Sequence, residues 1–186
     1  MADSDEPSPD EMFELLYEIV PQVYRGELVE GRITMSPKSG ARSAIIEDVR
    51  GQMLERFGRK GNRFPMDVGL DLPGGGNVFC PDLFKPAAGA KPDKKGKWRY
   101  QDVEFVLEVV SRGTARNDYG VKKDTYAVAE IAVYVIADPY TGKCHVYTLP
   151  KDGEYHGYST IDFGEPIDLT DTVLGMTLET DEFPRE

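Results

Sequence analysis

The chain has 186 residues, of which 40% are hydrophobic, and it carries a formal net charge of −11. This length and composition suit one domain with a sizeable core, and the negative charge argues against strong nonspecific binding to DNA, although it leaves room for a local basic patch. No apolar run approaches the ~20 residues that span a bilayer, and the acidic N-terminus lacks a signal-peptide pattern, so we expect a cytoplasmic protein without a membrane segment.

Cysteine and histidine are scarce, with two residues of each. Two cysteines in strand-like runs of a cytoplasmic protein favour free thiols over a disulfide. So few histidines and cysteines also argue against a zinc cluster.

The N-terminal third predicts a tail, two helices and one strand. Residues 1–8 are acidic and rich in Pro and Ser, which predicts a disordered tail, and residues 9–186 are expected to form a single domain. Apolar residues recur at helical spacing over 11–19 and 39–57, which predicts two amphipathic helices. The alternation between them, over 27–35, predicts a strand.

Two further strands are predicted over 64–72 and 78–84, joined by the turn Pro73 to Asn77. This glycine-rich turn is not a phosphate-binding loop, because no Lys-Ser/Thr pair and helix follow it. Pro81 cannot donate a hydrogen bond to a neighbouring strand, so it indicates an edge, a strand end or a bulge.

The mostly apolar run over 103–110 predicts a strand that is buried on both faces. Because side chains alternate along a strand, Glu108 shares its face with Val106 and Val110. Asp82 has similar apolar neighbours in the preceding strand. A carboxylate in such surroundings is unfavourable unless it is paired, protonated or bound to a cation. Two carboxylates on neighbouring strands would repel each other, and a bound hard divalent cation such as Mg²⁺ usually offsets this repulsion.

A helix is predicted after the turn at 111–114, and it carries Asp118, Lys122 and Tyr126 at four-residue spacing. Taken alone, Asp118 and Lys122 are more typical of a solvated pair on a helix surface, and Tyr126 of core packing. Gly120 weakens this helix slightly, and it either permits a close backbone approach or has no role.

The remainder predicts a meander of strands over 131–137, 143–149 and 154–160, with a short strand candidate over 167–169, and residues 173–178 lead to the C-terminus. The order of helices and strands along the whole chain predicts an α/β fold with a mixed central β-sheet flanked by helices.

Taken in order, these residues resemble the PD-(D/E)XK nuclease superfamily, and more closely its Uma family of restriction-endonuclease-like proteins. The resemblance extends from about Phe13 to Phe183 and implies one restriction-endonuclease-like domain. The segments that carry it are Glu27–Arg32, Met35–Pro37, Pro81–Asp82, Glu108–Ser111, Asp118, Lys122, Tyr126 and Tyr134–Pro139.

The resemblance implies that Asp82 and Glu108 bind a metal ion, Mg²⁺ or Mn²⁺, and that Glu27 is a further ligand. Glu27 would otherwise be an ordinary acid on a solvent-exposed strand. The superfamily pattern places a lysine two residues after the second acid, where this chain has Val110. The family instead carries its lysine on the following helix, which matches Lys122.

The chain departs from the family at a second position as well. The family often has a histidine shortly after its Met-Ser-Pro segment, and this chain has Arg42-Ser43 there. A role for that position is therefore not carried over.

The activity that the resemblance implies is metal-dependent hydrolysis of phosphodiester bonds in DNA by an endonuclease. The metal on Asp82 and Glu108 would polarise the phosphoryl oxygen and activate a water, while Lys122 would orient that water or stabilise the developing charge. Asp118 would either position Lys122 or assist the metal, and Tyr126 would either touch substrate or pack in the core.

Two other interpretations stand beside this one. A catalytically inactive nuclease fold that binds nucleic acid or protein is favoured by Val110 in the lysine position and by the net negative charge. The retained Asp82, Glu108 and Lys122 favour the active enzyme, because an inactive site is expected to lose costly buried charges. The third interpretation is an unrelated α+β domain with acids at its strand edges.

DNA is the expected partner, and the run of basic residues over 91–99 is either a patch that contacts it or a solvated hairpin loop. A homodimer is compatible with this chemistry, because two sites cut two strands most easily, but the sequence does not show one.

Overall fold

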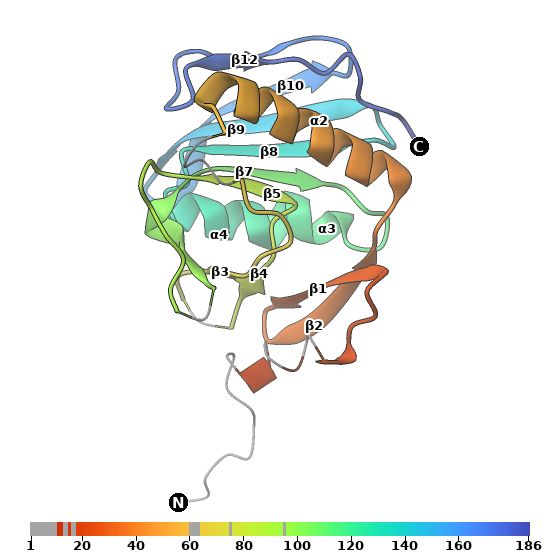
Figure 1. Cartoon of the computed structure of the whole chain (residues 1–186), viewed down its shortest axis with the longest axis vertical. Helices are drawn as coiled ribbons and strands as arrows, with labels where there is room; N and C mark the ends of the chain where they lie inside the picture. The colour runs from red at the N-terminus through yellow and green to blue at the C-terminus, as the bar shows by residue number, and fades with distance from the viewer. Residues whose placement is uncertain (1–10, 13–14, 16–17, 60–63, 75, 95) are drawn as a thin grey trace, which may run out of the picture.

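The computed structural model describes residues 11–186 except 13–14, 16–17, 60–63, 75 and 95 (Figure 1). The predicted tail over 1–8 lies outside the described residues. In the predicted helix over 11–19, the described residues are helical. Among the helices that the structure describes, none combines the length and the hydropathy needed to cross a membrane.

One five-stranded sheet contains the N-terminal hairpin and has the order β2-β1-β4-β3-β6. Its strands are β1 (Tyr24–Val29), β2 (Arg32–Pro37), β3 (Leu70–Asp71), β4 (Val78–Phe79) and β6 (Trp98–Arg99). The single strand predicted over 27–35 is wrong, because Glu30 and Gly31 adopt φ of 49° and 72° and turn the chain back on itself.

The second five-stranded sheet is the mixed central sheet predicted by the sequence, with the order β10-β9-β8-β7-β5. Only β7 and β8 are parallel neighbours, and the other pairs are antiparallel. The strands are β5 (Leu83–Pro86), β7 (Val103–Val109), β8 (Val133–Asp138), β9 (Lys143–Lys151) and β10 (Glu154–Asp162). A small two-stranded sheet follows, formed by β11 (Ile167–Leu169) and β12 (Met176–Leu178), and a 3-10 turn, η1 (Tyr100–Asp102), precedes β7.

Helices cover the central sheet on both faces, as the fold prediction requires (Figure 1). On one face lies α2 (Gly40–Phe57), whose N-cap Ser39 accepts a hydrogen bond from the backbone of Arg42. Apolar residues of α2 pack there against the Phe105 side of β7. The other face meets three consecutive helical segments, which are α3 (Ala115–Asn117), the π-helical turn η2 (Asp118–Lys122) and α4 (Lys123–Val128).

The strand predicted over 78–84 is divided between the two sheets. Its first part is β4 in one sheet and its last part is β5 in the other, so Cys80, Pro81 and Asp82 link the two sheets. The interruption falls at Pro81, which cannot donate to a ladder. Asp82 therefore lies at the junction of the sheets, and its predicted place within a strand is wrong.

The strand predicted over 64–72 is also mostly absent, since only Leu70 and Asp71 are extended and paired. Asp67 adopts φ of 52°, which a strand does not accommodate. The two cysteines, Cys80 and Cys144, are buried free thiols, as predicted.

Candidate functional site

Asp82 and Glu108 lie on adjacent segments of the central sheet. Glu108 is on β7 and shares its face with Val106 and Val110, as predicted from the alternation. Asp82 immediately precedes β5, which pairs with β7, and its Oδ2 accepts a hydrogen bond from the backbone N–H of Val109. Both carboxylates have 0% exposure, so neither reaches solvent in this conformation.

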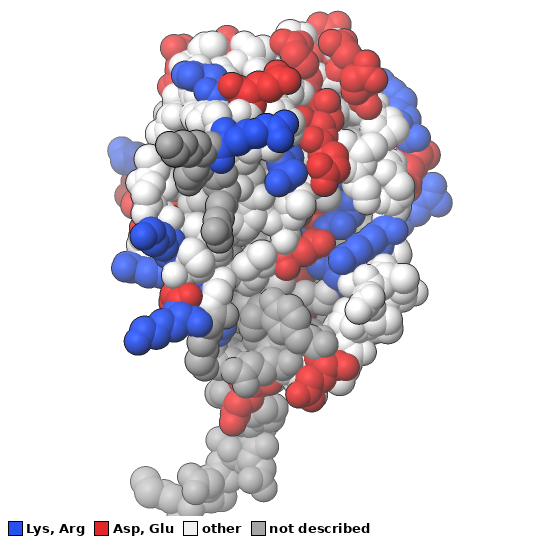
Figure 2. Space-filling view, in the orientation of Figure 1, with Lys and Arg blue, Asp and Glu red and all other residues white. Residues whose placement is uncertain are grey.

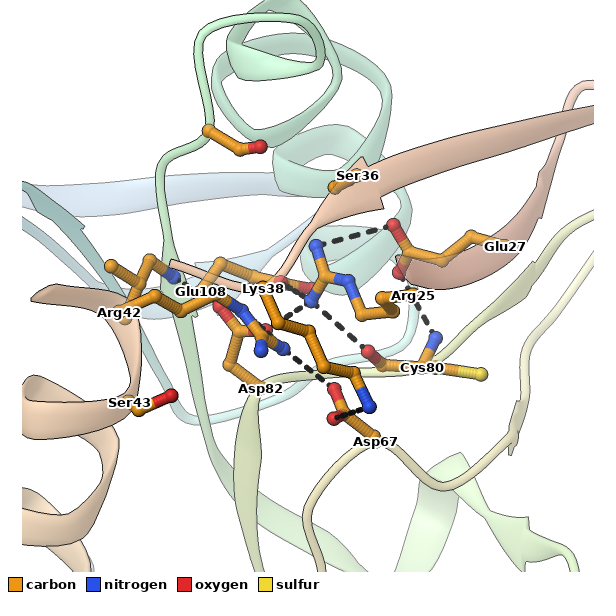
Figure 3. Close-up of polar contacts among 12 residues, drawn as sticks. Arg25, Glu27, Ser36, Lys38, Arg42, Ser43, Asp67, Cys80, Asp82 and Glu108 are labelled. Atoms are coloured by element: carbon orange, nitrogen blue, oxygen red, sulfur yellow. Dashed lines mark hydrogen bonds and ion pairs between the residues drawn. The ribbon is translucent and has the colours of Figure 1, made fainter. Parts of the chain in front are cut away.

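A guanidinium lies between these two carboxylates (Figure 3). Arg25 Nη1, which reaches in from β1, donates to Asp82 Oδ1, to Glu108 Oε2 at 2.9 Å and to the carbonyl oxygen of Cys80 at 3.2 Å. Its Nη2 lies 3.4 Å from Glu27 Oε2. The side chain thus contacts all three of the predicted metal ligands.

A second arginine reaches Asp82 from the first turn of α2 (Figure 3). Arg42 Nε donates to Asp82 Oδ1 at 2.8 Å, and its Nη2 contacts both Asp82 Oδ1 and, at 2.6 Å, Asp67 Oδ1. Asp67 is partly exposed and also pairs with Lys38, whose Nζ is 3.4 Å from its Oδ2. Arg42 therefore connects the buried group to the surface.

Lys122 is the third buried cation of the group. Its Nζ lies 2.8 Å from Glu27 Oε2 and 3.0 Å from both Glu108 Oε1 and Asp118 Oδ1. The sequence therefore correctly identified residues that meet in space, namely Glu27, Glu108 and Lys122. Asp82 joins them through Arg25 rather than through Lys122.

The segment that carries Lys122 differs from the expected helix. Asp118 and Lys122 are both buried, so their description as a solvated surface pair is wrong. They lie at the two ends of the π-helical turn η2, a rare element that often occurs at functional sites. Tyr126 packs in the core and donates a hydrogen bond to Glu108 Oε1 at 3.0 Å. A Cβ at Gly120 would meet nothing within 4 Å, so this glycine serves no close backbone approach.

The buried charges shift one another's pKa values in opposite directions. Burial alone would raise the pKa of Asp82 and of Glu27, but cationic neighbours outweigh it and hold both values below their usual range. For Glu108, burial prevails over the attraction of Lys122 and Arg25 and raises the pKa to about 8. Burial also raises the pKa of Asp118, whereas the surrounding carboxylates overcome burial and raise that of Lys122.

The group is not fully satisfied by hydrogen bonds. Arg25 Nε, both carboxylate oxygens of Asp118 and Lys122 Nζ are buried without a hydrogen-bond partner, although Lys122 is within ion-pair distance of three acids. Buried polar atoms usually have partners, so the ion pairs of Lys122 with Glu27, Glu108 and Asp118 are the contacts that compensate this part of the network.

The carboxylates are the right chemical type for Mg²⁺ or Mn²⁺, but their present arrangement does not fit a metal ion. No group of three or more Asp, Glu, His or Cys side chains among the described residues is arranged to hold one. The reason lies in the contacts above, because Arg25 Nη1 stands between Asp82 and Glu108.

Basic side chains do not gather into one continuous surface on the face shown in Figure 2, where acidic side chains cluster toward the upper part and basic ones are scattered among them. Within the predicted basic run, Lys91, Lys94 and Arg99 are exposed, and Lys95 lies outside the described residues. The segment is a loop leading into β6, and the structure leaves both interpretations of it open.

Arg25, Arg42 and Asp67 were not identified from the sequence as site residues. Arg25 carried one usable signal, because it lies two residues before Glu27 and therefore on the same face of a strand. Arg42 stood at the position of the family's frequent histidine, but nothing in its neighbourhood indicated a buried carboxylate partner. Asp67 follows no recognisable pattern.

Comparison with known proteins supports one family. The Uma2 family model, described as "Putative restriction endonuclease", matches residues 9–181. No curated protein matches the chain. Among solved structures, the chain is similar to a putative nuclease from Anabaena variabilis, with 13% sequence identity, a TM-score of 0.71 and coverage of 96% of this chain and 97% of the other. At this identity, the likeness shows a shared fold.

Proposed function

The chain belongs to the Uma2 family of restriction-endonuclease-like proteins, and from this premise we propose that it is an endonuclease that hydrolyses phosphodiester bonds in DNA. The observation that carries the proposal is the convergence of Glu27, Glu108 and Lys122 at one point, although they come from a strand, a second strand and a helical turn far apart in the chain. Asp82 lies beside them, joined to Glu108 through Arg25.

The side chains suit hydrolysis of a phosphodiester. The ammonium group of Lys122 would stabilise the negative charge that develops on the phosphoryl oxygens. Asp118 lies 3.0 Å from Lys122 and would hold its ammonium group in place.

We further propose Mg²⁺ or Mn²⁺ as the cofactor, with Asp82, Glu108 and Glu27 as its ligands. Carboxylate oxygens are the ligands these ions prefer, and a bound ion would supply a Lewis acid at the phosphate.

A non-catalytic binding module is the second candidate, and one observation favours it. Asp82, Glu108, Asp118 and Lys122 are almost completely buried, and arginines already pair with the first two. A site of this kind can persist as a structural ion network without turning over any substrate.

The test is cleavage of supercoiled plasmid and of single-stranded DNA by the full chain, with Mg²⁺, Mn²⁺ or EDTA. We expect metal-dependent nicking that falls by at least about 100-fold in Asp82→Asn and in Lys122→Met. Asp138→Asn is the matched control, because Asp138 is also a buried acid but bonds to Tyr119 and the following turn instead. Circular dichroism would establish that each variant is folded.

The outcomes separate the two candidates. Nicking that is lost in both site variants and retained in the control supports the nuclease. Absence of nicking by the wild-type protein on either substrate, with any of the metals, excludes it and leaves the binding module, whose affinity for DNA would then be measured by fluorescence anisotropy. Sedimentation of the same preparation would show whether the chain forms a homodimer.

A further inference from the structure

Three cationic side chains are buried in the site, and they differ in which carboxylates they touch. Arg42 contacts Asp82, and Lys122 contacts Glu108. Arg25 contacts both, since its Nη1 donates to Asp82 Oδ1 and Glu108 Oε2. One nitrogen atom therefore bridges the two acids that a metal ion would have to bridge.

We propose that Arg25 is an internal competitor of the divalent metal ion, and that the ion binds Asp82 and Glu108 only by displacing the Arg25 guanidinium. The inference rests on the proposed function, because it concerns the metal ligands of that same site. It adds a residue for which the family pattern assigns no role.

The contacts of the guanidinium support this exchange. Asp82 and Glu108 both attract Arg25, and the same two carboxylates would have to attract the metal ion. Two buried cations side by side repel each other unless carboxylates compensate both. The guanidinium and the ion would therefore compete for one pair of acids.

The hydrogen bonding of Arg25 supports it as well. Its Nε is buried without a partner, so the guanidinium is held through its two terminal nitrogens alone. An unpaired buried donor weakens the resting arrangement.

The experiment measures binding of Mn²⁺ alone to the full chain by isothermal titration calorimetry. Arg25→Met removes the guanidinium and keeps an unbranched side chain. We expect this variant to bind one Mn²⁺ at least about 10-fold more tightly than the wild-type protein. Mn²⁺ should also raise its melting temperature by more than that of the wild-type protein.

Two further variants locate the effect. Arg50→Met makes the same chemical change on α2, where Arg50 pairs with the exposed Glu47, and should bind Mn²⁺ as the wild-type protein does. Arg25→Met combined with Asp82→Asn should lose the gained affinity, because the exposed ligand pair is then incomplete.

Arg25→Lys keeps the proposal testable if Arg25→Met does not fold without metal. Lysine preserves the charge but cannot bridge both acids through a planar fork, so this variant should bind Mn²⁺ with intermediate affinity. The proposal would be overturned if the variant of Arg25 that folds binds Mn²⁺ no more tightly than the wild-type protein does. The nuclease proposal fails separately, if Arg25→Met with Mn²⁺ bound cleaves no DNA.

Discussion

Tyr126 on α4 donates a hydrogen bond of 3.0 Å to Oε1 of Glu108 on β7, and both side chains are completely buried. The same oxygen lies 3.0 Å from Lys122 Nζ, whereas Oε2 faces Arg25. The two oxygens of Glu108 therefore have different partners. Oε1 is held by the helical segment, and Oε2 contacts the guanidinium.

Tyr126→Phe should lower the free energy of unfolding by about 1 kcal/mol, because Oε1 loses a donor but keeps Lys122 nearby. Urea denaturation measures the change. Tyr158→Phe removes a hydroxyl that is hydrogen-bonded to His145 and Thr160 at an exposed site, where water can replace the lost partners, so it should leave stability nearly unchanged. Equal effects of the two substitutions would show that the bond to Glu108 contributes nothing specific.

Glu108 should make the protein less stable as pH rises from about 4.5 to about 8. Its pKa is raised from 4.5 to about 8 in the folded protein, so over this range the folded state binds a proton that the unfolded state has released. The free energy of unfolding should therefore fall with pH, with a slope of at most about 1.4 kcal/mol per pH unit.

Urea denaturation across this pH range, for the wild-type protein and Glu108→Gln, measures the slope. Glutamine cannot ionise, so the decline should be smaller in the variant. An unchanged slope would assign the pH dependence to other groups. Glu27 and Asp82 contribute in the opposite sense, because their lowered pKa values stabilise the folded state only above their usual titration range, and that stabilisation is lost in acid.

Arg42 offers a comparison between two carboxylates on one guanidinium. Asp82→Asn removes the buried partner and should lower the free energy of unfolding by about 3–5 kcal/mol. The cause is that the positive charges of Arg25 and Arg42 stay buried with one negative charge fewer beside them. Asp67→Asn removes the partly exposed partner, 31% of whose side chain is accessible, and should cost less than about 1 kcal/mol. Thermal and urea denaturation measure both. A larger loss in Asp67→Asn would contradict the view that the buried contact dominates.

Gly120 should tolerate a side chain, because a Cβ there meets nothing within 4 Å and its φ is not positive. Gly120→Ala is expected to raise the free energy of unfolding by about 0.4–1 kcal/mol, because alanine lowers the conformational entropy of the unfolded chain. Gly142→Ala is the contrasting variant, since Gly142 has φ of 65° and its Cβ would meet Arg185, and it should be destabilising. Stability curves in urea would rank the three proteins, and destabilisation by Gly120→Ala would indicate that η2 requires glycine.

The site could be predicted from the sequence where a charge stood within an apolar run. Glu108 is an example, because its strand alternates strictly and its neighbours reveal the face it occupies. Glu27 and Lys122 were found through their order along the chain, which the family shares. The β7 strand and α2 were found with nearly their observed bounds because each is long and strongly patterned.

The remaining features depend on contacts between segments far apart in the chain. Arg25 and Arg42 resemble ordinary surface arginines, and only the folded protein brings both to Asp82. The sheet of order β2-β1-β4-β3-β6 was missed for a similar reason, since its strands β3, β4 and β6 each have two residues and form through pairing with neighbours rather than through local propensity. The π-helical turn likewise has no sequence signature that separates it from an α-helix.

Cys80, Pro81 and Asp82 link β4 to β5, and the length of this link is fixed by its contacts. Surface loops generally accept insertions, but here the backbone N–H of Cys80 bonds to Glu27, its carbonyl accepts from Arg25, and Pro81 accepts from the N–H of Asp67. One added residue would shift Asp82 relative to both sheets at once. A change in length at this link would therefore remove the site together with the join between the sheets.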